Sequence, residues 1–164
     1  MMAAMRFTHS VRYDAPLADV FAMLSDPAFR HKACAHMGVI SADVSITAQG
    51  EGFSLVIDQV QPTEGVPSFA KKFAGDTTRA VQKEQWPDSS GGSFEVETPG
   101  KPASVKGQIT LTESGGVTTE TMQAEVKIKV PLIGGKMESL MAELIAKGMD
   151  KEHEVGVAWL KGER

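Results

Sequence analysis

Cysteine is nearly absent from this sequence of 164 residues. Because Cys34 is the one cysteine, the chain cannot form an intrachain disulfide, which is typical of proteins from a reducing compartment. The chain also has no run of about 18 apolar residues, the length that a membrane-spanning helix needs. Its first residues lack the apolar core of a signal peptide, because Arg6 follows Met5 at once. These absences predict a cytoplasmic protein, with residues 1–4 either disordered or upstream of a true start at Met5.

The sequence has no excess of positive charge either. Its 17 Lys and Arg residues are outnumbered by 21 Asp and Glu residues, which gives a formal net charge of −4 at pH 7. Proteins that bind nucleic acids normally have a basic face, so we expect no nucleic-acid partner. The length of 164 residues is too short for two domains of ordinary size. We therefore expect a single domain over residues 5–163.

The N-terminal part of the chain combines one strand with two short helices. Alternating side chains from Met5 to Tyr13 predict a half-buried strand. Asp14, followed by Pro16, is a signal for the start of a helix, and Asp26 with Pro27 repeats that signal. We expect two short helices to follow the first strand.

A period of two then governs about ninety residues and predicts six further strands. The last of these strands has the clearest pattern, with Met122, Val126 and Val130 on one face. Pro131 ends the sheet, and a helix is expected from Gly135 to Leu160, with a length of roughly 39 Å at 1.5 Å per residue. The predicted fold is α+β: a seven-stranded antiparallel sheet that curves around one long C-terminal helix.

This order of elements resembles the helix-grip superfamily, which includes START lipid-transfer domains, birch-pollen-allergen-like proteins and polyketide cyclases, together often labelled SRPBCC. Residues 66–73, 92–100 and 130–136 look like a bacterial branch catalogued as a domain of unknown function. The resemblance covers residues 5–163 and implies a deep apolar cavity between the sheet and the C-terminal helix. Members of the superfamily bind lipids, sterols, polyketides or plant hormones. The resemblance brings no catalytic motif with it.

The apolar inward face of the sheet could form either a packed core or the wall of a ligand cavity. Nine methionines favour a deformable wall, because this side chain adapts to irregular contents. With the resemblance added, we expect the cavity. The residues expected to line it are Phe53, Leu55, Ile57, Phe94, Val96, Ile109, Met122, Val126, Ile128, Met137, Met141 and Leu144.

Residues 65–76 are expected to form a long loop, and long loops in compact domains are often lids. Phe69 and Phe73 lie four residues apart, so one turn of helix would bring both rings together. They are the predicted lid, placed to gate the cavity or to touch a membrane surface. The alternative is that both rings pack against the sheet.

Catalytic and metal-binding residues are not evident. His9 is in phase with Phe7 and is expected to point inward, which makes it a weak candidate for an acid or base. His31, Cys34 and His36 do not have the spacing of a structural zinc site, which needs four ligands. No catalytic residue, metal or cofactor is predicted. The charged residues of segment 150–154 are expected on a solvated face.

The leading functional hypothesis is a non-enzymatic carrier or sensor that binds a hydrophobic small molecule or lipid. The first alternative is an enzyme of the cyclase or hydrolase type that acts on an apolar substrate in the same cavity. The second is a protein-interaction module. An enzyme should place polar side chains together inside the cavity, whereas a carrier needs at most one polar anchor. A homodimer and transient contact with a membrane are left open.

Overall fold

The computed structural model describes residues 4–63 and 65–164, so most of the N-terminal segment 1–4 lies outside the described residues. The elements follow one another as β1 (Met5–Tyr13), α1 (Leu17–Leu24), α2 (Pro27–His36), β2 (Ser41–Gln49), β3 (Gly52–Pro62), α3 (Ser68–Ala74), β4 (Thr77–Asp88), β5 (Gly91–Glu97), β6 (Ala103–Ser114), β7 (Val117–Ile128) and α4 (Gly134–Leu160). The predicted α+β fold is confirmed. The sequence predicts a loop for residues 65–76, but the structure places helix α3 within it.

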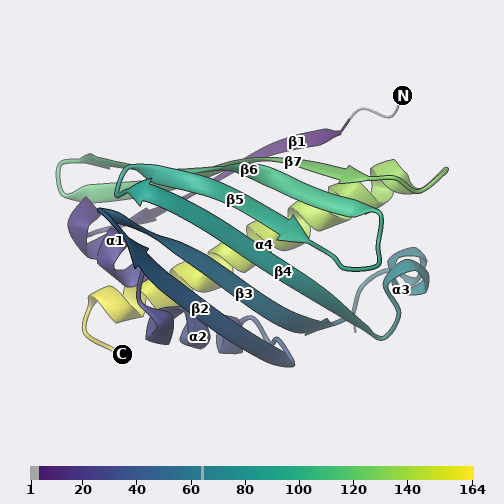
Figure 1. Cartoon of the computed structure of the whole chain (residues 1–164), viewed down its shortest axis with the longest axis horizontal. Coiled ribbons are helices and arrows are strands. Elements are labelled where there is room, and N and C mark those ends of the chain that lie inside the picture. The colour runs from purple at the N-terminus through teal and green to yellow at the C-terminus, as the bar shows by residue number, and fades with distance from the viewer. Residues whose placement is uncertain (1–3, 64) are drawn as a thin grey trace.

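The seven strands form one antiparallel sheet with the order β1-β7-β6-β5-β4-β3-β2. Consecutive strands from β2 to β7 are neighbours, and β1 joins the far edge by pairing with β7, from Met5 opposite Val126 to Tyr13 opposite Thr118. The sheet curves over α4, which crosses behind it diagonally (Figure 1). Helices α1 and α2 lie at the C-terminal end of α4, and α3 lies at the opposite end of the sheet (Figure 1). This arrangement leaves α4 as the main cover of the inner face.

Helix α4 packs against β1, β7 and α2. Near its start, the Glu138 carboxylate accepts a hydrogen bond of 2.9 Å from the backbone N–H of Ile128, which joins the helix to β7. Near its end, Gly156 allows a close approach, because a Cβ atom there would lie 2.6 Å from Cε1 of Tyr13. No helix among the described residues is long and apolar enough to cross a membrane.

The two short N-terminal helices begin in different ways. Asp26 caps α2 as expected, since its side chain accepts a hydrogen bond of 2.9 Å from the N–H of Ala28. Asp14 does not cap α1. The N-cap residue is Pro16, and the N–H of Leu17 donates instead to Glu113 of β6 at 2.6 Å. A distant carboxylate thus replaces the local cap.

Candidate ligand-binding cavity

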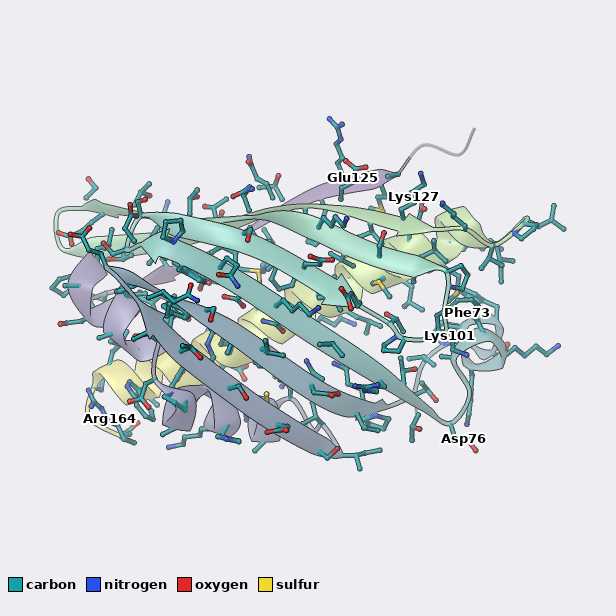
Figure 2. The ribbon with its side chains drawn as sticks, in the orientation of Figure 1. Phe73, Asp76, Lys101, Glu125, Lys127 and Arg164 are labelled. Atoms are coloured by element: carbon teal, nitrogen blue, oxygen red, sulfur yellow. The ribbon has the colours of Figure 1, made fainter. Side chains whose placement is uncertain are left out.

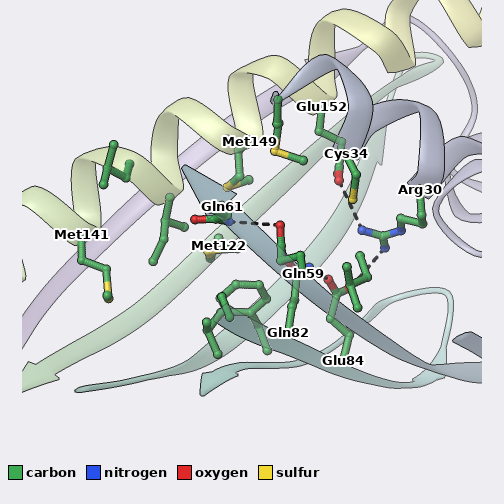
Figure 3. Close-up of a pocket in the computed structure, with 18 of the residues that line it drawn as sticks. Arg30, Cys34, Gln59, Gln61, Gln82, Glu84, Met122, Met141, Met149 and Glu152 are labelled. Carbon is green, nitrogen blue, oxygen red and sulfur yellow. Dashed lines mark hydrogen bonds and ion pairs between the residues drawn. The ribbon is translucent and has the colours of Figure 1, made fainter. Parts of the chain in front are cut away.

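A cavity of about 190 Å³ lies between the inner face of the sheet and α4 (Figure 3). It is larger than the engineered cavity of about 150 Å³ that binds benzene, so it can hold a small organic molecule. Its wall comes from α2, from β3 through β7, and from α4. The lining residues are Arg30, Cys34, Met37, Ile57, Gln59, Gln61, Thr78, Ala80, Gln82, Glu84, Phe94, Val96, Thr98, Ile109, Glu120, Met122, Met141, Leu144, Ile145, Gly148, Met149 and Glu152.

A second pocket of about 110 Å³ continues from the first beneath α3. The two pockets share five lining residues: Gln61, Thr78, Thr98, Met141 and Leu144. Together their volumes reach the lower end of the range of about 300–1,000 Å³ that is typical of ligand sites. The space therefore has an inner part beside α2 and an outer part beside α3.

The residues predicted to line a cavity fall into two groups. Ile57, Phe94, Val96, Ile109, Met122, Met141 and Leu144 line the inner part, and Met137 lines the outer part with Met141 and Leu144. Phe53, Leu55, Val126 and Ile128 line neither part and are buried in the packed core.

Packing explains why Phe53, Val126 and Ile128 are excluded from the cavity wall. Phe53 stacks on Trp86, with 5.5 Å between the ring centroids, and Phe21 covers it at 5.6 Å. Val126 and Ile128 lie at the end of β7, which the Glu138 carboxylate of α4 holds through the Ile128 N–H, and both side chains are fully buried there.

The two phenylalanines of the predicted lid have different positions. Both are half-buried on α3, but only Phe73 lines the outer pocket. Lys101, which also lines the outer pocket, contacts this residue: its ammonium donates to the Phe73 carbonyl at 2.8 Å and lies 5.5 Å from the ring centroid. Figure 2 shows Phe73 and Lys101 together at the end of the sheet beside α3.

The inner end of the cavity contains an arginine whose three nitrogens are all engaged. Arg30 is 3% exposed. Its Nη2 donates to Glu84 at 3.2 Å and its Nη1 donates to Glu152 at 3.3 Å (Figure 3). Its Nε donates to the carbonyl of Leu24 at 2.8 Å. The side chain thus links α2 to β4 and α4.

Among the carboxylates at the inner end of the cavity, Glu84 accepts the most hydrogen bonds. Besides Arg30, it accepts hydrogen bonds from Gln82 at 2.6 Å and from the indole N–H of Trp86 at 2.8 Å. These donors satisfy the hydrogen-bonding capacity of the buried Glu84 carboxylate. Glu84 therefore acts as the counter-ion of Arg30.

Glu120 has the opposite environment. It lines the cavity from β7, it is 4% exposed, and no described residue donates a hydrogen bond to it. Burial raises the pKa of its carboxyl from 4.5 to about 8, and the charge of Glu152 adds to this effect while Arg30 opposes it. The pKa of Glu152 is also raised, mainly by burial. The raised pKa favours the protonated form of Glu120, whose carboxyl faces the cavity.

Two further side chains beside this cluster have little access to solvent. The hydroxyl of Tyr13 is buried without a hydrogen-bond partner among the described residues, and burial raises its pKa, with a smaller contribution from the charge of Glu120. Cys34 lines the cavity as a free thiol, and burial raises its pKa. A thiol with a raised pKa is a poor nucleophile at neutral pH.

His9 lies outside both pockets. Its ring faces α4, as the sequence predicts, but it bonds to the Asp150 carboxylate at 2.7 Å and keeps 26% of its side chain exposed. His36 similarly pairs with Glu154 at 2.6 Å. In the part of the chain that the structure describes, no three potential ligands are grouped to hold a metal.

The expectation that segment 150–154 forms a solvated face is wrong for Glu152. Asp150 and Glu154 are exposed, but Glu152 points into the cavity and binds Arg30. The signal was in the helical spacing, because Glu152 lies four residues from both Gly148 and Gly156 on the inner side of α4.

Sequence reasoning also missed the polar residues of the inner sheet face. Glu120 lies two residues before Met122, and Glu84 lies two residues before Trp86, so each is in phase with a buried neighbour. Gln59, Gln61 and Gln82 have the same phase relationship to inward residues of β3 and β4. The period of two contained this information, but polar side chains were not expected to face inward.

A curved sheet closed by a C-terminal helix, with a cavity between them, defines the helix-grip class of domain. Within that class, the chain belongs to the family described as "Protein of unknown function (DUF2505)", whose model matches residues 8–160. A comparison with curated proteins gave no match.

Several solved structures are similar to this chain. TTHA0849 from Thermus thermophilus is 15% identical with a TM-score of 0.64, over 96% of this chain and 98% of that one. The Zhui aromatase/cyclase from Streptomyces sp. R1128 is 10% identical with a TM-score of 0.66, over 96% and 94%. A conserved protein from Geobacillus kaustophilus is 23% identical with a TM-score of 0.59, over 94% and 97%. These similarities establish the fold alone, and at that level they confirm the predicted helix-grip resemblance.

Proposed function

We propose that the protein binds a small amphipathic molecule, mainly apolar with one polar group, between the sheet and α4. The cavity itself carries this proposal, because it combines an apolar wall with a cluster of polar side chains at one end. Met122, Met141 and Leu144 provide adaptable apolar contacts, and Glu120 provides a hydrogen-bonding group that no described residue uses. A ligand with a polar group at one end would match both parts.

The proposal is tested by filling the cavity from α4. Gly148 lines the inner part, and a Cβ atom there would meet only the sulfur of Met37, at 3.4 Å. We expect Gly148→Phe to occupy the ligand space while the domain stays folded. Gly135→Phe is the matched control, because a Cβ at Gly135 meets no atom within 4 Å.

Native mass spectrometry of protein purified from its own host provides the measurement. Wild type and Gly135→Phe should carry a co-purifying small molecule that Gly148→Phe lacks. Titration with octylamine, 1-octanol and octanoate as probes extends the test to ligands lost during purification. If the wild type carries no molecule and binds none of these probes, the proposed function is wrong.

A second candidate function is an enzyme that acts on an apolar substrate in the same cavity, and Glu120 favours it. A carboxyl with a pKa of about 8 can give and take a proton near neutral pH, as a general acid or base must. Polar groups from α2, β4, β7 and α4 also converge at one end of the cavity, the arrangement expected of an enzyme. The aromatase/cyclase from Streptomyces sp. R1128 has the same fold.

The enzymatic candidate is tested with small-molecule extracts of the host. Wild-type protein should deplete one compound and produce another, whereas Glu120→Gln should leave the extract unchanged because an amide cannot transfer the proton. If the wild-type protein also leaves the composition of the extract unchanged, the result would argue for a carrier.

A further inference from the structure

We propose that the inner end of the cavity accepts a cationic amine, so that the ligand is an amphipathic molecule whose ammonium group is held by Glu120 and Glu152. This inference rests on the ligand-binding function proposed above and specifies the chemistry of the ligand's polar group. It follows from the hydrogen-bonding state of each charged side chain at that end.

Among the described residues, Arg30 is the one cation that lines the cavity's inner part, and it is already committed to partners within the protein. Its three nitrogens donate to Glu84, Glu152 and the Leu24 carbonyl. A carboxylate or phosphate ligand would also face three glutamate side chains. Repulsion between like charges in a water-poor site disfavours such a ligand.

The glutamate side chains at this end have carboxyl oxygens that are free to accept hydrogen bonds. Glu120 is more than nine-tenths buried, lines the cavity, and receives no hydrogen bond from a described residue. Glu152 accepts from Arg30 through Oε2, and no described residue donates to its Oε1. An ammonium group has three donors and no acceptor, so it fits this set of oxygens.

The apolar part of the cavity determines where the rest of the ligand lies. Met141 is on the opposite side of the cavity from Arg30 (Figure 3) and also borders the outer pocket beneath α3. An alkyl or aromatic group attached to the ammonium would extend toward Met141 and Leu144. The ligand would then have its cationic end inside and its apolar end toward α3.

Proton linkage gives the proposal a readout that a purely hydrophobic ligand would not produce. A cation favours the ionised form of Glu120, so binding near neutral pH should release about one proton from this carboxyl. Groups on four elements act on or border this carboxyl: Tyr13 on β1, Arg30 and Cys34 on α2, Glu84 on β4, and Glu152 on α4.

The experiment compares three probes that share one alkyl chain: octylamine, 1-octanol and octanoate. Isothermal titration calorimetry at pH 7, in buffers of different ionisation enthalpy, gives both the affinity and the number of protons released. We expect octylamine to bind at least about tenfold more tightly than octanoate, the size of effect that one charged hydrogen bond contributes. Proton release should accompany octylamine and not 1-octanol.

Two variants on the same strand separate a site effect from a general charge effect. Glu120→Gln removes the ionisable group from the cavity, and we expect it to abolish proton release and to weaken octylamine binding by about tenfold. Glu125→Gln is the control, because Glu125 lies on the exposed face of β7. It should leave both quantities unchanged.

The outcomes distinguish a failure of the amine preference from a failure of ligand binding itself. Octanoate binding as tightly as octylamine, or octylamine binding that is unaffected by Glu120→Gln, would overturn the preference for an amine. Ligand binding itself would stand in that case. If none of the three probes binds and no molecule co-purifies, the proposed function fails together with this inference.

Discussion

Arg30 connects three parts of the molecule through a single guanidinium group. The helix α2 carries it, β4 supplies Glu84, and α4 supplies Glu152. All three side chains are largely withdrawn from solvent. Removal of the cation would leave two carboxylates without their main partner in a site that water does not reach freely.

We therefore predict that Arg30→Ala lowers the free energy of unfolding by about 3–5 kcal/mol, the cost of breaking a buried ion pair. Arg79→Ala is the control, because Arg79 pairs with Asp58 on the exposed face of the sheet, where solvent screens the interaction. Chemical denaturation measures both variants. Equal, small losses would mean that the buried pair contributes no more than the exposed one.

Glu120 makes the stability of the protein depend on pH. Its pKa is about 8 in the folded state, against an ordinary value of 4.5, so between these values the folded state binds more protons than the unfolded state. Stability must then fall as pH rises through this window. The raised pKa of Glu152 acts in the same direction, whereas the lowered pKa values of Asp58 and Glu154 act below it.

We predict a loss of stability on the order of a few kcal/mol between pH 5 and pH 8 for the wild type. Glu120→Gln should remove most of this dependence of stability on pH, because its amide stays neutral throughout. Denaturation midpoints at several pH values measure the effect. A wild-type curve that is flat or rising over this range would show that Glu120 ionises normally.

At the scale of single elements, two of the glycines in α4, Gly148 and Gly156, have opposite surroundings. A methyl group at Gly148 would meet only the Met37 sulfur, at an ordinary contact distance of 3.4 Å. A methyl group at Gly156 would lie 2.6 Å from the Tyr13 ring and 3.1 Å from the Met23 methyl group. Both positions gain helix propensity when glycine is replaced by alanine, so the difference lies in packing alone.

Gly148→Ala should stabilise the protein by about 1 kcal/mol, whereas Gly156→Ala should destabilise it. At Gly156 the rigid Tyr13 ring would have to move, and overpacking of this kind typically costs about 1–3 kcal/mol. Thermal unfolding of the two variants is the measurement. Stabilisation by both substitutions would mean that Tyr13 shifts without strain.

The elements also show how far local pattern can predict structure. The strand from Met5 to Tyr13 and the last strand followed from alternation alone, because each has one buried face. Asp14 was expected to cap α1, but the N–H of Leu17 bonds to Glu113, which lies 96 residues away along the chain. A bond to a distant residue leaves no local signal.

At the scale of the whole molecule, the inner site assembles residues that are far apart in the sequence. Arg30 lies 54 residues from Glu84 and 122 residues from Glu152. Periodicity could show that Glu84 and Glu120 are in phase with buried neighbours. It could not show that these residues meet, because the curvature of the sheet and the path of α4 bring them together.

The same limit applies to the lid, because the sequence could not distinguish the roles of its two phenylalanines. Phe73 lines the outer pocket and carries Lys101 on its ring, whereas Phe69 packs against the core without lining a pocket. Both are half-buried on a helix of seven residues, which should open locally at low free energy. Substituting each ring in turn should therefore distinguish a gating role from a packing role.

We predict that Phe73→Ala speeds the exchange of bound octylamine or 1-octanol, measured by NMR line shapes, and that Phe69→Ala changes exchange much less. Each variant should lose less stability than the roughly 3–5 kcal/mol typical of a fully buried phenylalanine, because part of each ring already meets solvent.

Hydrogen exchange should show weaker protection of the α3 amides than of those in β7, since α3 makes few contacts with the rest of the fold. If Phe73→Ala instead causes a large fall in the denaturation midpoint with exchange unchanged, α3 is a structural plug. Ligands would then have to enter the cavity elsewhere. The next candidate for the entrance is the surface at Leu144 of α4, because this side chain is half-exposed and borders both pockets.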